Sequence, residues 1–271
     1  MNKLNADKQA VVVSALVEGV SIRSIERMTG IHRDTIMRLS VRIGTACEKL
    51  MDGMLRNLNS RHLQMDELWA YVAKKDRHLK VDDDPRMVGS FWTFLAFDTE
   101  TKLVAAYRVG KRDAETTNAF VSDLASRLKG RVELSSDMMP AYVDAVRQSF
   151  GRAVDYGRII KHYESTTTAP GRYSPAAVTS VATDNVIGHP VMICTSHVER
   201  QNLNMRMNIR RFTRLTNAYS KKVENLRAAV SLYLAVYNLV RIHGSLRVTP
   251  AMESGVTDHV WTIGQLVALA Q

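Results

Sequence analysis

The sequence has few cysteines, a shortage of acidic residues and no long apolar run. Two cysteines in 271 residues cannot build a disulfide framework or a four-cysteine zinc site. No apolar stretch approaches the roughly 20 residues that a membrane-spanning helix needs. The first residues, "MNKLNADKQA", lack the apolar segment of a signal peptide. We therefore expect a cytoplasmic protein without a membrane partner.

The shortage of acid leaves the chain strongly basic. It carries 37 Lys and Arg residues against 27 Asp and Glu, a formal net charge of +10. Such an excess favours an acidic partner, and nucleic acid is the commonest one. A basic surface with no specific partner is the alternative. The hydrophobic content of 45% is enough for one large domain, or for a small module beside a catalytic-sized one.

The first part of the chain, residues 1–58, has the pattern of a helical DNA-binding module. "SIRSIERMTG" and "IHRDTIMRLSVRI" indicate a short helix, a glycine-containing turn and a second helix, which is typical of a helix-turn-helix. A helical hairpin with a purely structural or dimerising role is the alternative. The second helix exposes side chains suited to phosphates and to guanine edges in a major groove: Arg33, Thr35, Arg38 and Arg42.

From residue 60 the apolar pattern changes to the period of strands. "HLQMDELWAYV" alternates, "SFWTFLAFDTETKLVAAYRVG" indicates a β-hairpin, and helices then alternate with two further strands. Three antiparallel strands followed by alternating helix and strand is the order of an RNase H-like fold. We predict an α/β protein in which residues 59–271 form an RNase H-like mixed sheet with C-terminal helices. The polar, proline-containing stretch at about 165–196 is expected to be a mobile flap.

Three acidic residues occupy the places where this architecture gathers carboxylates. Asp66 lies in the middle of the first strand, Asp137 just past the fourth strand, and Glu199 on a late helix. Carboxylate oxygens suit Mg²⁺ or Mn²⁺, and two such ions about 4 Å apart clamp a phosphodiester during an in-line displacement. We therefore predict two divalent ions bound by these three acids. Two neighbouring acids are not predicted to bind these ions: Glu67, on the opposite face of the strand, and Asp98, in the hairpin turn.

Each acid also has a purely structural interpretation. Asp66 could pair with Lys74 or Lys75 at a strand edge. Asp137 could be the N-cap of the helix that follows it. Glu199 could be a first-turn acid favoured by the helix dipole. The order of all three along the predicted elements favours the metal site.

The segment after Glu199 is rich in cations. Between Arg200 and Arg227 there are eight basic residues and one acid. Arginines recurring every four residues in a continuous helix would form one stripe, a track for the DNA backbone. Asn202, one helical turn after Glu199, is expected to order a metal-bound water or a phosphate, or else to bond neighbouring backbone. The DNA contacts predicted here are Arg200, Asn202, Arg206, Arg210, Arg211, Arg214, Lys221 and Lys222.

The stretch "VERQNLNMRMNIRRFTRLTNAYSKK" resembles the signature around the catalytic glutamate of DDE transposases from bacterial insertion sequences of the IS-one-like family. "QMDELWAYVAKK", "SSDMMPAY" and "YLAVYNLVRIHGSLRVTPAMESG" resemble corresponding parts, so the resemblance covers roughly residues 60–255. It implies a DDE triad at Asp66, Asp137 and Glu199, two divalent metals and DNA cut-and-join activity. It also implies that Arg241 and His243 support the active site, although a structural role for His243 stays open. The cysteine-rich zinc segment that some relatives carry is absent.

The predicted function is that of a transposase, which binds the ends of its insertion sequence and catalyses strand cleavage and strand transfer. The partners are then double-stranded DNA, at terminal inverted repeats and target sites, and at least one further copy of the chain, in the bacterial cytoplasm at the nucleoid. An RNase H-like nuclease or resolvase without strand transfer is one alternative. A non-catalytic helix-turn-helix regulator is the other.

Overall fold

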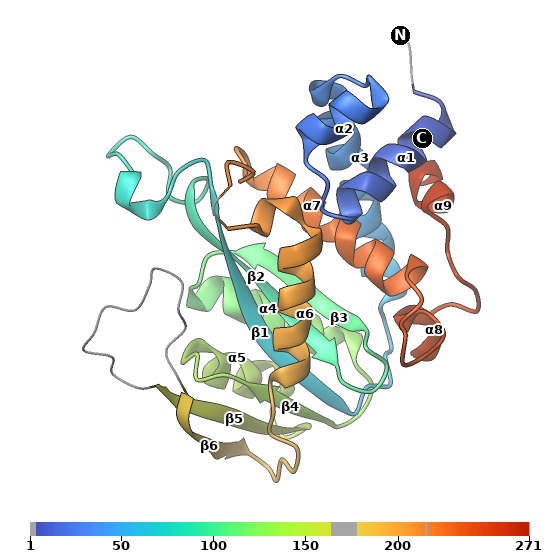
Figure 1. Cartoon of the computed structure of the whole chain (residues 1–271). Coiled ribbons are helices and arrows are strands. Elements are labelled where there is room, and N and C mark those ends of the chain that lie inside the picture. Colours follow the sequence, from blue (N-terminus) through green and yellow to red (C-terminus); the bar gives the residue numbers. More distant parts are fainter. Residues whose placement is uncertain (1–3, 164–177, 215, 271) are drawn as a thin grey trace.

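The computed structural model describes residues 4–163, 178–214 and 216–270 (Figure 1). A six-stranded sheet with the order β3-β2-β1-β4-β5-β6 lies at its centre. The strands are β1 (His62–Val72), β2 (Gly89–Asp98), β3 (Val104–Gly110), β4 (Val132–Ser136), β5 (Val154–Tyr163) and β6 (Val178–Ile187). β1, β2 and β3 are antiparallel neighbours, β4 runs parallel to β1, and β5 runs parallel to β4. This arrangement confirms the predicted mixed α/β fold of RNase H-like topology.

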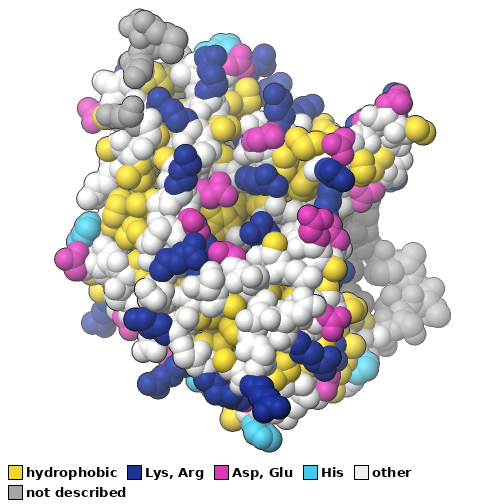
Figure 2. Space-filling model, turned by 180° about the vertical axis from the view of Figure 1, so that it is seen from behind, with side chains coloured by type: hydrophobic (Ala, Val, Ile, Leu, Met, Phe, Trp, Pro, Cys, Tyr) yellow, Lys and Arg dark blue, Asp and Glu magenta, His cyan; other side chains and the backbone are white. Residues whose placement is uncertain are grey.

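Helices cover both faces of the sheet. α4 (Ala114–Arg127) and α5 (Ala141–Phe150) lie behind it, and α6 (Ser196–Asn208) crosses in front of β1 (Figure 1). The rings of Phe120 and Tyr142, from α4 and α5, pack on Phe94 of β2 with centroids 5.6 and 6.4 Å away. Seen from behind, Lys and Arg side chains are interspersed with Asp and Glu (Figure 2). On this face the basic residues therefore do not form a patch of one sign.

The N-terminal helices pack against the C-terminal ones. They are α1 (Ala6–Val17), α2 (Ile22–Thr29) and α3 (Arg33–Met54), and their partners are α7 (Val223–Ala235) and α9 (Ile263–Ala268). α8 (Pro250–Glu253) packs against the turn Val236–Val240 that follows α7. α3 runs along α7, α1 contacts α9, and one continuous apolar core joins them to the sheet. Gly30 ends α2 in the left-handed conformation (φ 70°), which glycine adopts without strain, and so makes the sharp turn into α3. The boundary at residue 58 stays a prediction.

Within the described residues, every helix is too short or too polar to cross a lipid bilayer.

A second glycine sets how closely α3 approaches α7. A Cβ added at Gly44 would lie 2.2 Å from the backbone oxygen of Ala228, whereas one at Gly53, in the same helix, would meet nothing within 4 Å. We expect Gly44→Ala to lower the free energy of unfolding by roughly 2 kcal/mol, because a backbone must move. Gly53→Ala should raise it by about 0.5–1 kcal/mol. Urea unfolding of both variants tests this, and equal effects would contradict the close crossing.

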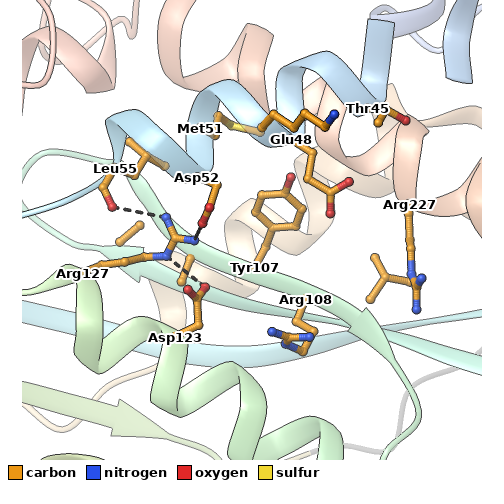
Figure 3. Close-up of a pocket in the computed structure, with 14 residues that line it drawn as sticks. Thr45, Glu48, Met51, Asp52, Leu55, Tyr107, Arg108, Asp123, Arg127 and Arg227 are labelled. Carbon is orange, nitrogen blue, oxygen red and sulfur yellow. Dashed lines mark hydrogen bonds and ion pairs between the residues drawn. The ribbon is translucent and has the colours of Figure 1, made fainter. Parts of the chain in front are cut away.

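The end of α3 is fixed to α4 by Arg127, whose side chain is buried. Its guanidinium donates to Asp52 of α3 at 2.6 Å, to Asp123 of α4 at 2.9 Å and to the backbone oxygen of Leu55 at 3.2 Å (Figure 3). These contacts line one end of a cavity of about 510 Å³ between α3, β3 and α4. One arginine thus joins the N-terminal helices to the sheet domain.

At the outer edge of β3, a side chain forms hydrogen bonds with the backbone N–H and oxygen of Val104. α7 continues into a π-helical turn, Val236–Val240, which carries the fully buried Asn238. Its Nδ2 donates to the backbone oxygen of Val104 at 3.0 Å, and its Oδ1 accepts from the backbone N–H of Val104 at 3.1 Å. The amide thus makes the pair of bonds that a neighbouring strand would make.

Part of the expected flap is a strand. β6 (Val178–Ile187) pairs antiparallel with β5 along the edge of the sheet. The segment "VTSVATDNVI" is rich in β-branched residues, which favour a pleated edge. This part of the expected flap is therefore a strand, and the mobility of the flap stays a prediction. Residues 164–177 of that stretch lie outside the described residues.

A candidate active site on the central strands

Three carboxyl groups meet where β1 passes the end of β4. One oxygen from each of Asp66, Glu67 and Asp137 lies within 4.8 Å of the others. Asp66 and Glu67 are consecutive in β1, and Asp137 directly follows β4. Because Met65 pairs with Ser136 in parallel register, the sheet itself places Asp137 beside Asp66.

Asp66 has one hydrogen-bonding side chain and strongly acidic surroundings. The Nδ2 group of Asn202, on α6, donates to its Oδ2 at 2.7 Å. Burial, together with the charges of Glu67, Asp137 and Glu199, raises the pKa of Asp66 to about 7, against one backbone hydrogen bond that lowers it. The carboxylates therefore repel one another at neutral pH, and a bound cation would relieve that repulsion.

Glu67 is held differently. Arg112 donates to its Oε1 at 2.7 Å and the hydroxyl of Tyr142 donates to its Oε2 at 3.1 Å. Burial and the charge of Asp137 raise the pKa of Glu67, and Arg112 opposes them. Strand alternation predicted that Glu67 and Asp66 lie on opposite faces, but the structure brings Glu67 into the cluster. Both of its carboxylate oxygens accept hydrogen bonds, from Arg112 and from Tyr142.

Glu199 lies at the rim, in the first turn of α6. Thr195 Oγ1 donates to its Oε1 at 2.6 Å, and Lys161 of β5 forms an ion pair with the same oxygen. Its side chain is 44% exposed, and it is outside the group of three oxygens within 4.8 Å. The structure therefore brings Asp66 and Asp137 together and leaves Glu199 facing them, close enough for its charge to raise the pKa of Asp66.

The start of α6 is attached to β1 by Gln64. Its buried Oε1 accepts from the backbone N–H groups of His197 and Val198 at 2.9 and 3.0 Å, which are free donors of the first helical turn. Gln64 and Asp66 are two residues apart and so lie on the same face of the strand. Gln64 is a polar residue on an otherwise core-facing side of β1. This pattern could have indicated its role, but the role was not predicted from the sequence.

The structural interpretations of Asp66 and Asp137 are not supported by the contacts. Lys74 pairs with Asp83 at 2.7 Å, and Lys75 lies over the Tyr71 ring, 5.7 Å from its centre. Asp137 Oδ1 accepts from the backbone N–H of Met139 at 3.0 Å, and α5 begins only at Ala141. Asp137 thus stabilises a local turn ahead of the helix and leaves its other oxygen for the cluster.

The donor set fits a hard divalent cation. Asp66, Asp137 and Glu199 offer carboxylate oxygens, the ligands that Mg²⁺ and Mn²⁺ prefer. The Oδ1 atom of Asn202 is buried and has no hydrogen-bond partner in the described part of the chain. A buried acceptor without a donor is costly, and a metal-bound water would satisfy it.

The basic stripe predicted after Glu199 does not form as one helical row. α6 ends at Asn208, and a 3₁₀ turn, Arg210–Phe212, follows. The chain leaves the helix because Ile209 and Phe212 are both buried in the core. Burial lowers the pKa of Arg206, which the charge of Arg214 lowers further and the charge of Asp66 raises, so Arg206 lies within electrostatic range of Asp66.

The other predicted contact residues lie in several places. Arg33, Arg38, Arg200, Arg214, Lys221 and Lys222 are exposed, Thr35 is half-buried, and Arg42 donates to Gln9 at 2.7 Å. Asn202 is buried and bonds Asp66, as described above. Arg241 pairs with Glu18 of α1 at 2.5 Å, and His243 lies 3.0 Å from the Ser245 hydroxyl. Within the described residues, neither Arg241 nor His243 forms an ion pair or a hydrogen bond with the three acids.

The raised pKa of Asp66 predicts a pH dependence of stability. The folded protein keeps this proton up to about pH 7, whereas the unfolded chain loses it near its ordinary value of 3.8. The free energy of unfolding should therefore fall as pH rises between these values, by up to about 4 kcal/mol. In Asp66→Asn, the part of this decrease in the free energy of unfolding that comes from Asp66 should be absent. In the wild type at pH 8, about 10 mM Mg²⁺ should restore the lost stability.

Urea unfolding at pH 5 and pH 8, with and without Mg²⁺, measures the effect. The difference between wild type and Asp66→Asn isolates this group from the others that titrate. A wild type that is no less stable at pH 8 than the variant would contradict the strained carboxyl cluster.

Comparison with known proteins gives weak similarities. No protein-family model and no curated protein matches the chain. A cryo-EM structure of the piggyBac transposase synaptic complex with hairpin DNA is 10% identical, with a TM-score of 0.44, over 99% of this chain and 71% of that one. The Mos1 transposase paired-end complex with the left transposon end is 13% identical, with a TM-score of 0.22, over 55% of this chain and 58% of that one. Both TM-scores are below 0.5, so the fold is assigned from the chain's own sheet order.

Proposed function

We propose that the chain is a DDE transposase that cuts and joins the DNA ends of its own insertion sequence. One observation carries the proposal: Asp66 and Asp137 meet on an RNase H-like sheet, and α6 brings Glu199, Asn202 and Arg206 to the same side. Carboxylates for metals and a cation for phosphate therefore converge at one place.

The acids have the chemistry of a metal-dependent phosphoryl-transfer site. Asp66, Asp137 and Glu199 would hold two Mg²⁺ or Mn²⁺ ions, which activate a water or a 3′-hydroxyl and stabilise the leaving oxygen. Asn202 orients the Asp66 carboxyl group through its 2.7 Å hydrogen bond. Lys161 forms an ion pair with Glu199. Arg206, near Asp66, would neutralise a phosphate that enters the site.

The N-terminal helices would supply recognition of the element's ends. α2, the Gly30 turn and α3 have the helix-turn-helix form, with Arg33 and Arg38 exposed near the start of α3. We propose residues 1–58 as the DNA-binding domain and residues 59–271 as the catalytic domain. Holding two ends together requires at least two copies of the chain. The place of action would be the bacterial nucleoid.

The test is a cut-and-join reaction. The purified protein is incubated with labelled DNA that flanks its own coding region, a target plasmid, and Mg²⁺ or Mn²⁺. We expect a nick at the element's end and a labelled plasmid product. Nicks without joined product would indicate a nuclease or resolvase. Binding without cleavage under both metals would overturn the proposal in favour of a regulator.

A further inference from the structure

A groove of about 740 Å³ lies between the N-terminal helices and the segment that joins α6 to α7. One wall is formed by the end of α1, the start of α2 and the start of α3. The other is formed by Ile209–Arg211, by 216–222 and by α7. We call it the basic groove.

The charge of the basic groove has one sign. Its lining includes six basic residues and a single acid, Asp34. The basic residues are Arg23, Arg33, Arg210, Arg211, Lys221 and Lys222. Among these six, within the described residues, only Arg33 forms an ion pair, at 3.7 Å from Asp34. The back of the molecule, by contrast, mixes both signs (Figure 2). This concentration of unneutralised cations favours a polyanion.

Arg211 is the most enclosed of these cations. Its Nη1 donates to the Ser220 hydroxyl at 3.2 Å, and burial lowers its pKa to about 10. Arg211 is half-buried. A guanidinium partly removed from water favours an anionic partner, and its planar fork matches a phosphate. Tyr219 and Leu232 add apolar surface that suits a deoxyribose.

We propose that the basic groove binds the sugar–phosphate backbone of the DNA duplex held by α2 and α3, and leads that duplex to the acids. The inference rests on the proposed function and extends it with a second, sequence-independent contact. Arg33 belongs both to the groove and to the predicted recognition helix, so one duplex can meet both.

α6 connects the groove to the acids. Glu199 is in its first turn, Asn202 and Arg206 follow on successive turns, and Ile209 is a groove residue. Ten residues from Glu199 to Ile209 correspond to about 15 Å along a helix. At about 3.4 Å per nucleotide, this is four to five base pairs. Groove-bound phosphates should therefore lie roughly that far from the cleaved bond.

The experiment compares two double variants of equal charge change. Lys221→Gln/Lys222→Gln removes two groove cations, and Lys129→Gln/Arg152→Gln removes two exposed cations beyond α4 and α5. Both are made in the Asp66→Asn protein so that no DNA is cut. The probe is a fluorescent random-sequence duplex of about 30 base pairs, and its affinity is measured from about 50 to 200 mM KCl.

We expect the groove variant to lose affinity on the order of tenfold near 100 mM KCl. The slope of log affinity against log salt concentration should become less negative by about 1 to 2, one contact per lysine. The control should keep the parent slope. Thermal unfolding of each variant checks that it is folded, and Arg210→Gln supplies a second groove variant.

Equal slopes in the groove and control variants would overturn the inference. If the wild type still cuts and joins its flanking DNA, the proposed function survives that failure. Binding of poly-glutamate by each variant is measured in parallel. If the groove variant loses poly-glutamate binding but keeps the parent salt slope for DNA, the groove binds an acidic protein, and the inference is also overturned. If the wild type binds no DNA, the proposed function and the inference fail together.

Discussion

Asp66→Asn should slow strand cleavage at least about a thousandfold while DNA binding is retained. The Asp66 carboxyl group is central to the cluster of acids and bonds Asn202. An amide keeps its size and one acceptor oxygen but loses the negative charge that holds a divalent ion. Losing several kcal/mol of transition-state stabilisation gives a factor of this size. Cleavage of end-labelled flanking DNA and a gel-shift assay measure the two effects separately.

The matched variants decide which acids act together. Asp137→Asn and Glu199→Gln should lower cleavage as strongly. Asp98→Asn is the control, because Asp98 is also a buried aspartate but accepts from the backbone N–H groups of the β2–β3 hairpin at 2.8 and 3.0 Å. Glu67→Gln should have a smaller effect than any triad variant. If Glu199→Gln cleaves DNA like the wild type and Glu67→Gln does not cleave it, then Glu67 rather than Glu199 is the third metal ligand.

Replacing Arg127 should have the largest effect on stability. Arg127→Leu removes the donor to Asp52, Asp123 and the backbone oxygen of Leu55, and its side chain is only 8% exposed. Breaking a buried charge network leaves its partners unpaired. We expect a loss of roughly 3 kcal/mol in the free energy of unfolding, or about 6–12 °C in melting temperature. Calorimetry and urea unfolding measure it.

Arg56→Leu is the matched control for Arg127→Leu. Arg56 contacts the same Asp52 at 2.5 Å, but both side chains are more than a third exposed. Exposed pairs contribute about 0–1 kcal/mol. If the two arginines proved equally important, the joint between α3 and α4 would not depend on the buried guanidinium.

The elements with a clear apolar period were predictable from the sequence. β1 to β5 and the helices up to residue 150 follow the expected pattern, because each buries one face and local spacing shows which. The positions of Asp66 and Asp137 follow from that pattern together with the strand order. The order of the predicted strands and helices also indicated the fold class.

Long-range contacts were not predictable. Gln64 acts on α6 across 133 residues of sequence, and Arg127 acts on Asp52 across 75, so neither has a local signal. The end of α6 at Asn208 depends on burial of Ile209 and Phe212 in the core, which only the tertiary structure shows. Strand alternation excluded Glu67 from the predicted metal site. This rule gives the face of the sheet on which a side chain starts, but not how far that side chain reaches near the end of a neighbouring strand.

The hydrogen bonds of Asn238 have a consequence for how copies of the chain associate. Sheets commonly join edge to edge, when an unpaired strand recruits one from another molecule. At Val104 such a strand would find the backbone N–H and oxygen already occupied by the side-chain amide. Extension of the sheet past this part of β3 is therefore blocked. If two copies associate, as the proposed function requires, they must meet through a surface other than this part of β3.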